Sequence, residues 1–359
     1  MFYEFWEEYN NMIKNEIKSL CKKKEKLRID LHMHTNYSSD GKQTLDEIIK
    51  NTCDKFDIIA ITDHDSIDVY NELYELLQKN IKSPIIIPGI EFTTDNVKYG
   101  NQAHIVQLFI NPCDKVLKHE VERNYNASFN RSKIQLHRLR YNEGLQVLLK
   151  KYNIKLEYDE YTEYLRNNGM VPEYDTLVNY IIFKTEDYFD NFDILKFQEE
   201  YNFKDVCVER RNLKEKAFAK IRNKYKEEDK HSSRMLLSIL GVRTVDDDWF
   251  NYRPSGSISV NSYGQLKIEE IDQKYLTVFA HPTESKLEVV NEIIKSTGIS
   301  TIEINVRNRY ENISKLYDMI KENKLMITKG SDNHELNSSL YDNLDFFEIK
   351  SMEVELLCH

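Results

Sequence analysis

The sequence has few cysteines and pairs none of them. Its 359 residues include five cysteines, and no two are spaced as Cys-x-x-Cys. Scattered thiols of this kind indicate a reducing compartment and argue against a thiolate metal site. We therefore expect a cytoplasmic protein. The cysteines are Cys21, Cys53, Cys113, Cys207 and Cys358.

Long apolar runs and an excess of positive charge are also missing. No apolar run approaches the roughly 20 residues that a membrane span needs. Charged residues begin at Glu4, where a signal peptide would have its apolar core. Lys and Arg total 50 against 60 Asp and Glu, so the net charge is −10. This balance argues against nucleic-acid binding by the whole surface, although it leaves a local basic groove open.

The first 20 residues read as an amphipathic helix. Their apolar side chains recur at three- and four-residue intervals, and charges of both signs lie between them. Mixed charges disfavour attachment to a membrane. The helix would pack either on the body of the protein or on a partner subunit, and the second interpretation would make the protein a homo-oligomer.

From Leu27 onward, short apolar strands alternate with helices. The chain is long enough for one large barrel or for two domains, and the alternation predicts an α/β fold, either a parallel barrel or a doubly wound sheet. The seven predicted strands are 29–34, 58–62, 85–88, 104–110, 276–280, 301–305 and 326–329. The helices between them lie near 45–55, 66–78, 284–296 and 309–323.

The middle of the chain does not continue this alternation. It has basic segments at 131–140 and 204–234 and an acidic stretch at 157–193. We interpret it as an inserted, mostly helical subdomain. The expected organisation is an N-terminal helix at 1–26, a first barrel part at 27–124, the insertion at 125–272 and a second barrel part at 273–350.

Two histidines, His32 and His34, end the first predicted strand. Alternate side chains of a strand share a face, so both imidazoles point the same way and Met33 points to the other side. Such a pair can bind one metal ion or two neighbouring ions. Surface or capping histidines would give the same pattern.

The rest of the chain favours metal ligation. Side chains at the carboxyl ends of parallel barrel strands converge on one face, and six predicted strand ends carry His, Asp or Glu. Nine ligands exceed the needs of one ion and suit two or three divalent ions. Their nitrogen and oxygen mix favours Zn, Mn or Fe over Ca or Mg. The candidate ligands are His32, His34, Asp40, His64, Glu91, His104, His281, Asp332 and His334.

Seven motifs surround these residues. They are Asp-Leu-His-Met-His-Thr (30–35), Ser-Asp-Gly (39–41), Ile-Thr-Asp-His-Asp-Ser (61–66), Pro-Gly-Ile-Glu (88–91), His-Ile-Val (104–106), Ala-His-Pro (280–282) and Gly-Ser-Asp-Asn-His (330–334). In order and content they closely resemble the PHP (polymerase and histidinol phosphatase) superfamily of metal-dependent phosphoesterases. The resemblance covers about 27–112 and 274–336, and it implies a distorted (β/α)7 TIM-like barrel with a trinuclear site.

The resemblance also implies which residues hold each ion. His32, His34, Glu91 and Asp332 would hold the first ion. Glu91, the single Glu of the set and a natural bridge, would hold the second ion with His104 and His281. Asp40, His64 and His334 would hold the third.

Within the superfamily, the chain looks most like the branch that acts on nucleotides. That branch includes 3′,5′-nucleoside bisphosphate phosphatases and 5′-to-3′ exoribonucleases, and Asn-Arg-Ser-Lys-Ile (130–134) resembles the start of its insertion. Histidinol phosphatases usually have a histidine in place of Asp40 and lack a large insertion. A histidinol-phosphate-type phosphatase and a non-catalytic PHP interaction module are the alternatives.

The functional hypothesis is hydrolysis of a phosphate ester by a hydroxide that bridges the bound ions. The substrate would be a phosphorylated nucleotide or a short 5′-phosphorylated nucleic acid. We expect Glu91, His64 and His334 to be the catalytic residues. Further substrate phosphates would need Arg or Lys, and Arg131 and then Arg307 are the candidates.

Overall fold

The computed structural model divides the chain into two compact units. One comprises Met1–Tyr125 and Gly264–His359, and the other comprises Asn126–Tyr263. The first unit is referred to below as the barrel unit. The structure describes residues 2–38, 41–79, 83–96, 101–140, 155–167, 180, 184, 264–282, 287–306, 310–334, 341 and 343–359.

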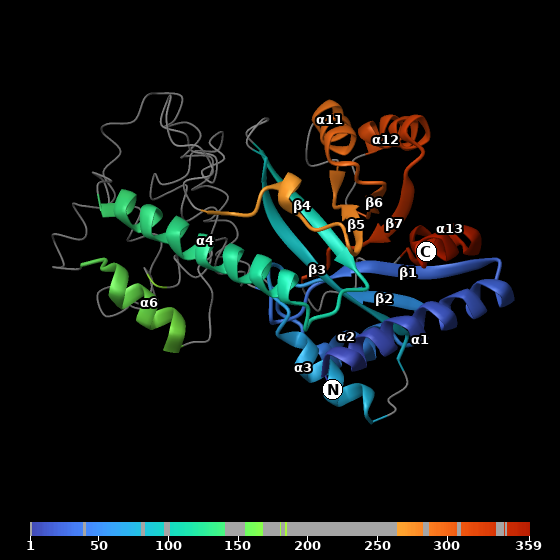
Figure 1. Cartoon of the computed structure of the whole chain (residues 1–359), viewed down its shortest axis with the longest axis horizontal. Coiled ribbons are helices and arrows are strands. Elements are labelled where there is room, and N and C mark those ends of the chain that lie inside the picture. The colour runs from blue at the N-terminus through green and yellow to red at the C-terminus, as the bar shows by residue number, and fades with distance from the viewer. Residues whose placement is uncertain are drawn as a thin grey trace, which may run out of the picture. The chain divides into compact units, whose positions relative to one another are not determined.

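An eight-stranded sheet forms the centre of the barrel unit (Figure 1). Its order is β7-β6-β5-β4-β3-β2-β1-β8. The strands are β1 (Lys26–Met33), β2 (Ile58–Ile61), β3 (Ile85–Asn96), β4 (Asn101–Leu108), β5 (Leu276–Phe279), β6 (Thr301–Asn305), β7 (Met326–Gly330) and β8 (Glu348–Lys350).

The sheet nearly closes on itself between β1 and the segment after β7. The His34 amide donates to the Asn333 carbonyl at 3.0 Å, and the Asp332 amide donates to the His32 carbonyl at 2.9 Å. These bonds join the two sides of the sheet where β1 and β7 end. The predicted α/β barrel is confirmed.

Three strand pairings differ from the prediction of a parallel sheet. β4 runs antiparallel to both β3 and β5, and β8 is an eighth strand antiparallel to β1. A four-residue connection joins β3 to β4, and only an antiparallel pair permits so short a link. The prediction that His104 lies toward a carboxyl strand end is therefore wrong. His104 lies in the first half of β4, which reaches the same edge because β4 is reversed.

Helices cover the sheet where the sequence alternation placed them. In the barrel unit they are α1 (Phe2–Lys23), α2 (Leu45–Thr52), α3 (Val69–Leu77), α11 (Leu287–Thr297), α12 (Tyr310–Asn323), α13 (Ser351–Leu356) and the short 3-10 helices η3 (Ile268–Glu270) and η6 (Leu344–Phe347). α4 (Lys115–Arg140) begins in the barrel unit and ends in the second unit, which also contains α6 (Tyr158–Asn167). Among the described residues, no helix is both long and apolar enough to cross a bilayer.

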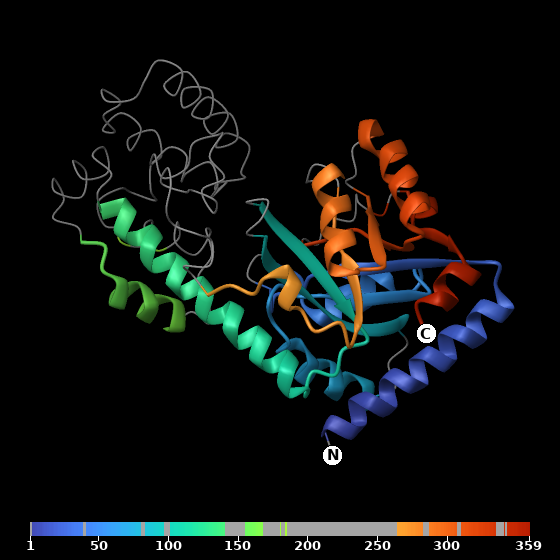
Figure 2. The same ribbon diagram turned by 45° about the horizontal axis from the view of Figure 1, so that its top comes forward.

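The N-terminal helix α1 packs on its own barrel (Figure 2). Trp6, at 0% exposure, is among its buried side chains. The Tyr9 hydroxyl donates to the Ile86 carbonyl at 2.9 Å, and the Asn10 amide donates to the Phe109 carbonyl at 3.0 Å. Of the two roles expected for this helix, the structure shows the packing on the protein's own body.

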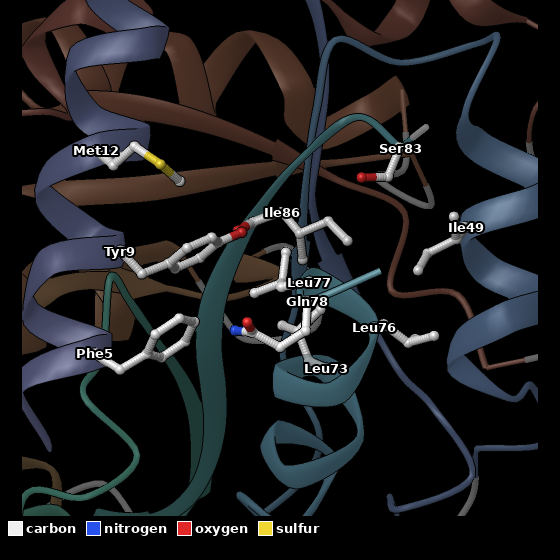
Figure 3. Close-up of a pocket in the computed structure, with 10 residues that line it drawn as sticks. All are labelled: Phe5, Tyr9, Met12, Ile49, Leu73, Leu76, Leu77, Gln78, Ser83 and Ile86. Atoms are coloured by element: carbon white, nitrogen blue, oxygen red, sulfur yellow. The ribbon is translucent and has the colours of Figure 1, made fainter. Parts of the chain in front are cut away.

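An apolar cavity of about 340 Å³ lies beneath α1 (Figure 3). One of its lining residues, Ile86, precedes Glu91 by five residues on β3, or about 16 Å along an extended strand. The cavity is thus separate from the polar strand ends. It is lined by Phe5, Tyr9, Met12, Ile49, Leu73, Leu76, Leu77, Gln78, Ser83 and Ile86.

The start of α4 is held against residues 264–275. Asp114 caps the helix by accepting the Val116 amide at 2.7 Å. The same carboxylate accepts a hydrogen bond from the Lys274 ammonium group at 2.5 Å. Further along α4, Glu120 accepts the Asp272 amide at 3.1 Å and is 6% exposed. These bonds join two parts of the barrel unit that are far apart in the sequence.

Glu120 should make stability depend on pH. Burial raises its pKa to about 7 from the ordinary 4.5, so between these values the native state binds more protons than the unfolded chain does. Stability therefore falls as the pH rises through that window. In Glu120→Gln, the side-chain oxygen can still accept a hydrogen bond from the Asp272 amide. Between pH 5 and pH 8 the unsubstituted protein should lose on the order of 2 kcal/mol of unfolding free energy, and we expect this variant not to show that loss.

Urea denaturation at several pH values measures this effect. Glu122→Gln, at an exposed position on the same helix, is the matched control and should keep the pH dependence of the unsubstituted protein. Parallel stability curves for Glu120→Gln and the unsubstituted protein would contradict the prediction.

Candidate metal centre

Eight of the nine predicted ligands lie together at one edge of the barrel. The pairing brings them there: β1, β2, β5 and β7 end at this edge, and the β3–β4 hairpin passes along it. An isolated parallel bridge links His64 to Glu91. The eight residues are His32, His34, His64, Glu91, His104, His281, Asp332 and His334.

Glu91 lies at the centre of the cluster and is 0% exposed. Its two carboxylate oxygens face different histidines. Oε2 lies 2.9 Å from His32 Nε2, and 3.1 Å from both His34 Nε2 and His64 Nδ1. Oε1 lies 2.9 Å from His104 Nδ1 and 3.0 Å from His281 Nε2. One carboxylate therefore joins two sets of ring nitrogens, which is the geometry of a bridging ligand.

Asp332 completes the set around Glu91 Oε2. Its Oδ1 lies 3.2 Å from His34 Nε2 and 3.6 Å from His32 Nε2. His34 Nε2 is buried and has no hydrogen-bond geometry with either carboxylate. An imidazole nitrogen held among carboxylate oxygens in this way suits a cation between them.

Potential ligand atoms fall into three overlapping groups, and within each group all atoms lie within 4.8 Å of one another. The groups are His32–Glu91–His281–Asp332, His34–His64–His334 and His64–Glu91–His104. Both the number of groups and the donor types fit two or three divalent ions. The groups divide the residues differently from the division that the resemblance implies, so the assignment of each residue to one ion stays a prediction.

The charges in the cluster compensate one another. Burial by itself would raise the pKa of Glu91, but His32, His64 and His104 hold it well below its usual value. Burial would lower the pKa of His34, yet Asp332 and Glu91 raise it to about 9. A proton on His34 would thus balance charge on the buried carboxylates. Divalent ions can take the place of such a proton, because metal binding to His releases it.

The loop after β1 is attached to the cluster through Ser38 and Asp63. Ser38 Oγ accepts the His64 amide at 3.1 Å and lies 3.2 Å from His34 Nδ1. Asp63 accepts the Thr35 amide at 2.6 Å and its hydroxyl at 2.7 Å. A partner on Nδ1 fixes the ring orientation of His34 and leaves Nε2 facing the site.

Two further carboxylates lie behind the ligands. Asp30 accepts the Ser331 amide at 2.9 Å, and burial raises its pKa to about 7. Glu303, on β6, lies against His32 Nδ1 at 2.9 Å. Both side chains are almost fully buried, at 0% and 2% exposure.

Sequence reasoning did not single out Glu303, Asp63 or Ser38 as functional residues. A signal was present for Glu303, since it is the acidic residue of the apolar strand Thr301–Asn305. Asp63 lies within the Thr-Asp-His motif, in which only the adjacent His64 is predicted to be a ligand.

Three predicted residues cannot be placed at the site. Asp40 and Arg307 lie outside the described residues. The backbone of Arg131 belongs to α4, but its side chain lies outside what the structure describes.

Known proteins provide an independent comparison. The family model of the PHP domain matches residues 30–204. No curated protein matches the sequence. A structure from Bifidobacterium adolescentis, assigned provisionally as a metal-dependent phosphoesterase, has 16% sequence identity and a TM-score of 0.51. The match covers 86% of this chain and 87% of that chain.

A second solved structure is an amidohydrolase from Chromobacterium violaceum with bound sulfate and no metal. It has 15% identity and a TM-score of 0.48, with 90% of this chain and 98% of that chain covered. The first structure supports the barrel fold, and the family model covers the motifs from His32 to His104. Residues 30–204 therefore match a PHP domain, and the resemblance to this family seen in the sequence is confirmed.

Proposed function

We propose that the protein is a metal-dependent hydrolase of phosphate esters whose substrate is a nucleotide or the 5′ end of a nucleic acid. The observation that carries the proposal is the placement of Glu91. Its two buried oxygens lie among separate sets of histidine nitrogens, at 2.9–3.1 Å. Neighbouring cation sites that share a carboxylate suit phosphoester hydrolysis.

The proposed metal ligands are the eight clustered residues together with Asp40. The bound ions would lower the pKa of water toward neutrality and offset the charge that builds on the phosphate oxygens. Mn, Zn and Fe all fit the nitrogen and oxygen donors.

The exposure of the ligands gives the centre a closed side and an open side. His32 and His34 are 1% and 0% exposed. His64, His104 and His334 are 14%, 27% and 16% exposed. A substrate would thus approach from the side of the second set. Glu91, His64 and His334 remain the proposed catalytic residues, since Glu91 joins the proposed ion sites and the two histidines lie on the open side.

Nucleotide specificity is supported by sequence features outside the cluster. The chain is interrupted after β4 by residues 126–263, and the Arg131 backbone lies in the helix that starts this interruption. Arg131 and Arg307 would bind a second phosphate through bidentate hydrogen bonds. A nuclease would instead track a strand with the basic segments.

Loss of the bridging carboxylate should release metal. In Glu91→Gln, one oxygen becomes an amide nitrogen that cannot bind a cation. We expect the dialysed variant to retain at least one ion fewer than the unsubstituted protein and to lose about 100-fold or more in kcat/KM. Elemental analysis and an assay with a phosphate ester measure the two effects. Glu122→Gln should change neither, and a Glu91→Gln protein with full metal content and activity would refute the bridging role.

Substrate preference can be tested directly. We expect the metal-loaded protein to release phosphate or nucleotide from adenosine 3′,5′-bisphosphate or from 5′-phosphorylated RNA and DNA oligonucleotides, and to do so only with metal. Turnover of the small molecule alone indicates a phosphatase, and turnover of oligomers with steep salt dependence indicates a nuclease. Histidinol phosphate as the sole substrate, or no hydrolysis of any compound, would contradict the proposal.

The two arginines should act on phosphates other than the scissile one. We expect Arg131→Ala and Arg307→Ala each to raise KM for a bisphosphate by about 10-fold, the effect of one lost charge-assisted contact. KM for a simple monophosphate ester should be unchanged. Lys118→Ala, at an exposed position of α4, is the control. Equal kinetics on the bisphosphate in variants and unsubstituted protein would remove the arginines from this role.

A further inference from the structure

The buried carboxylate of Glu303 contacts two of the candidate ligand residues at once. Its Oε1 lies 2.9 Å from His32 Nδ1, and its Oε2 accepts the backbone amide of His281 at 2.6 Å. Glu303 is 2% exposed, so both contacts are shielded from water. One side chain of β6 therefore links residues at the ends of β1 and β5.

The same two histidines face Glu91 on their other side. His32 Nε2 lies 2.9 Å from Glu91 Oε2, and His281 Nε2 lies 3.0 Å from Glu91 Oε1. The His32 and His281 rings lie 5.7 Å apart and close to parallel, at 26°. The four residues thus form a closed ring of contacts in which each histidine is held between two carboxylates.

The neighbouring strand leaves space for this arrangement. A Cβ atom at Gly330 on β7 would lie 1.9 Å from Glu303 Oε1 and 2.5 Å from His32 Cβ. Any side chain at this position would displace the carboxylate from the imidazole. Gly330 and Glu303 are therefore matched, and the contact with His32 depends on both.

The contact between Glu303 and His32 Nδ1 affects which nitrogen of the imidazole ring carries the proton. A neutral histidine that offers Nε2 to a cation carries its proton on Nδ1, and a carboxylate on Nδ1 selects that tautomer and makes Nε2 more basic. The second oxygen holds the His281 peptide, whose φ of 27° is one that residues other than glycine rarely adopt.

We propose that Glu303 is a positioning residue of the metal centre that fixes the His32 tautomer and the His281 backbone together, and so couples the two sides of the Glu91 bridge. The proposal rests on the metal binding in the proposed function. It adds a residue behind the ligands whose loss weakens metal binding although it does not itself face the cations.

Two substitutions separate charge from volume. Glu303→Gln keeps the volume, but its amide nitrogen cannot accept a proton from one of the two donors. Glu303→Asp keeps the charge and shortens the side chain. If Glu303 positions the two histidines through its charge, Glu303→Gln should bind Mn²⁺ 10- to 100-fold more weakly than the unsubstituted protein does. Glu303→Asp should then recover part of the lost affinity. If Glu303 only fills space, the order of the two variants should reverse.

The measurement is calorimetric titration of the metal-free full chain with Mn²⁺, with circular dichroism melts in chelator to show that each variant is folded. Glu120→Gln is the matched control, because it neutralises another buried carboxylate that accepts a backbone amide away from the centre, and it should bind Mn²⁺ normally. Gly330→Ala displaces the Glu303 carboxylate instead of replacing it, and it should weaken Mn²⁺ binding as Glu303→Gln does. It provides a second test if Glu303→Gln does not fold.

The outcomes separate this inference from the proposed function. If the unsubstituted protein binds no Mn²⁺, Zn²⁺ or Fe²⁺, the metal centre fails and this inference fails with it. If the unsubstituted protein binds Mn²⁺ and Glu303→Gln binds it equally well, the role of Glu303 alone is overturned. Weaker binding by Glu303→Asp than by Glu303→Gln would overturn it as well.

Discussion

Compensation of buried carboxylate charge is the constraint on which the rest of the barrel edge depends. Glu91, Glu303 and Asp332 are 0%, 2% and 6% exposed, and an uncompensated buried charge costs several kcal/mol. Each carboxylate therefore lies against imidazole groups or backbone amides. A cluster of this kind is a poor way to gain stability, because apolar residues of similar volume would do as well or better. Its retention at the strand ends is explained by cation binding, in which the same carboxylates and imidazoles become ligands.

The backbone around the cluster carries strain that the barrel has to hold. Asp332, Asp65 and His281 have φ values of 53°, 47° and 27°, in a region that costs residues other than glycine of order 1–3 kcal/mol each. Two of these residues are candidate ligands, and the third follows His64 directly. The strained Asp332 backbone is held by the hydrogen bond that its amide donates to the His32 carbonyl at 2.9 Å, and this hydrogen bond also helps to close the sheet. The same hydrogen bond thus closes the barrel and positions a candidate ligand.

Much of this edge could be predicted because strand periodicity is strictly local. His32 and His34 share a face on the basis of two residues of spacing, and the strand containing Glu303 was placed at residues 301–305, as observed. The direction of β4 could not be read in the same way, since His-Ile-Val gives the same pattern in a parallel or a reversed strand. Only the absence of a helix between β3 and β4 carried that information. The role of Glu303 was hidden because its partners, His32 and His281, are 271 and 22 residues away in the sequence.

The reversal of β4 also decides where the long insertion joins the barrel. Because β4 starts at the metal-centre edge, it ends at the opposite edge, and α4 begins there. The ten residues of α4 from Lys115 to Asn124 rise about 15 Å, which is similar to the length of β4 between His104 and Leu108. Asn124 then donates to Asp65 Oδ1 at 2.7 Å, and its own oxygen accepts the amide of Leu266 at 2.8 Å. The chain therefore leaves the barrel unit and returns to it within hydrogen-bonding reach of the residue after His64, a placement that a parallel fourth strand would not have produced.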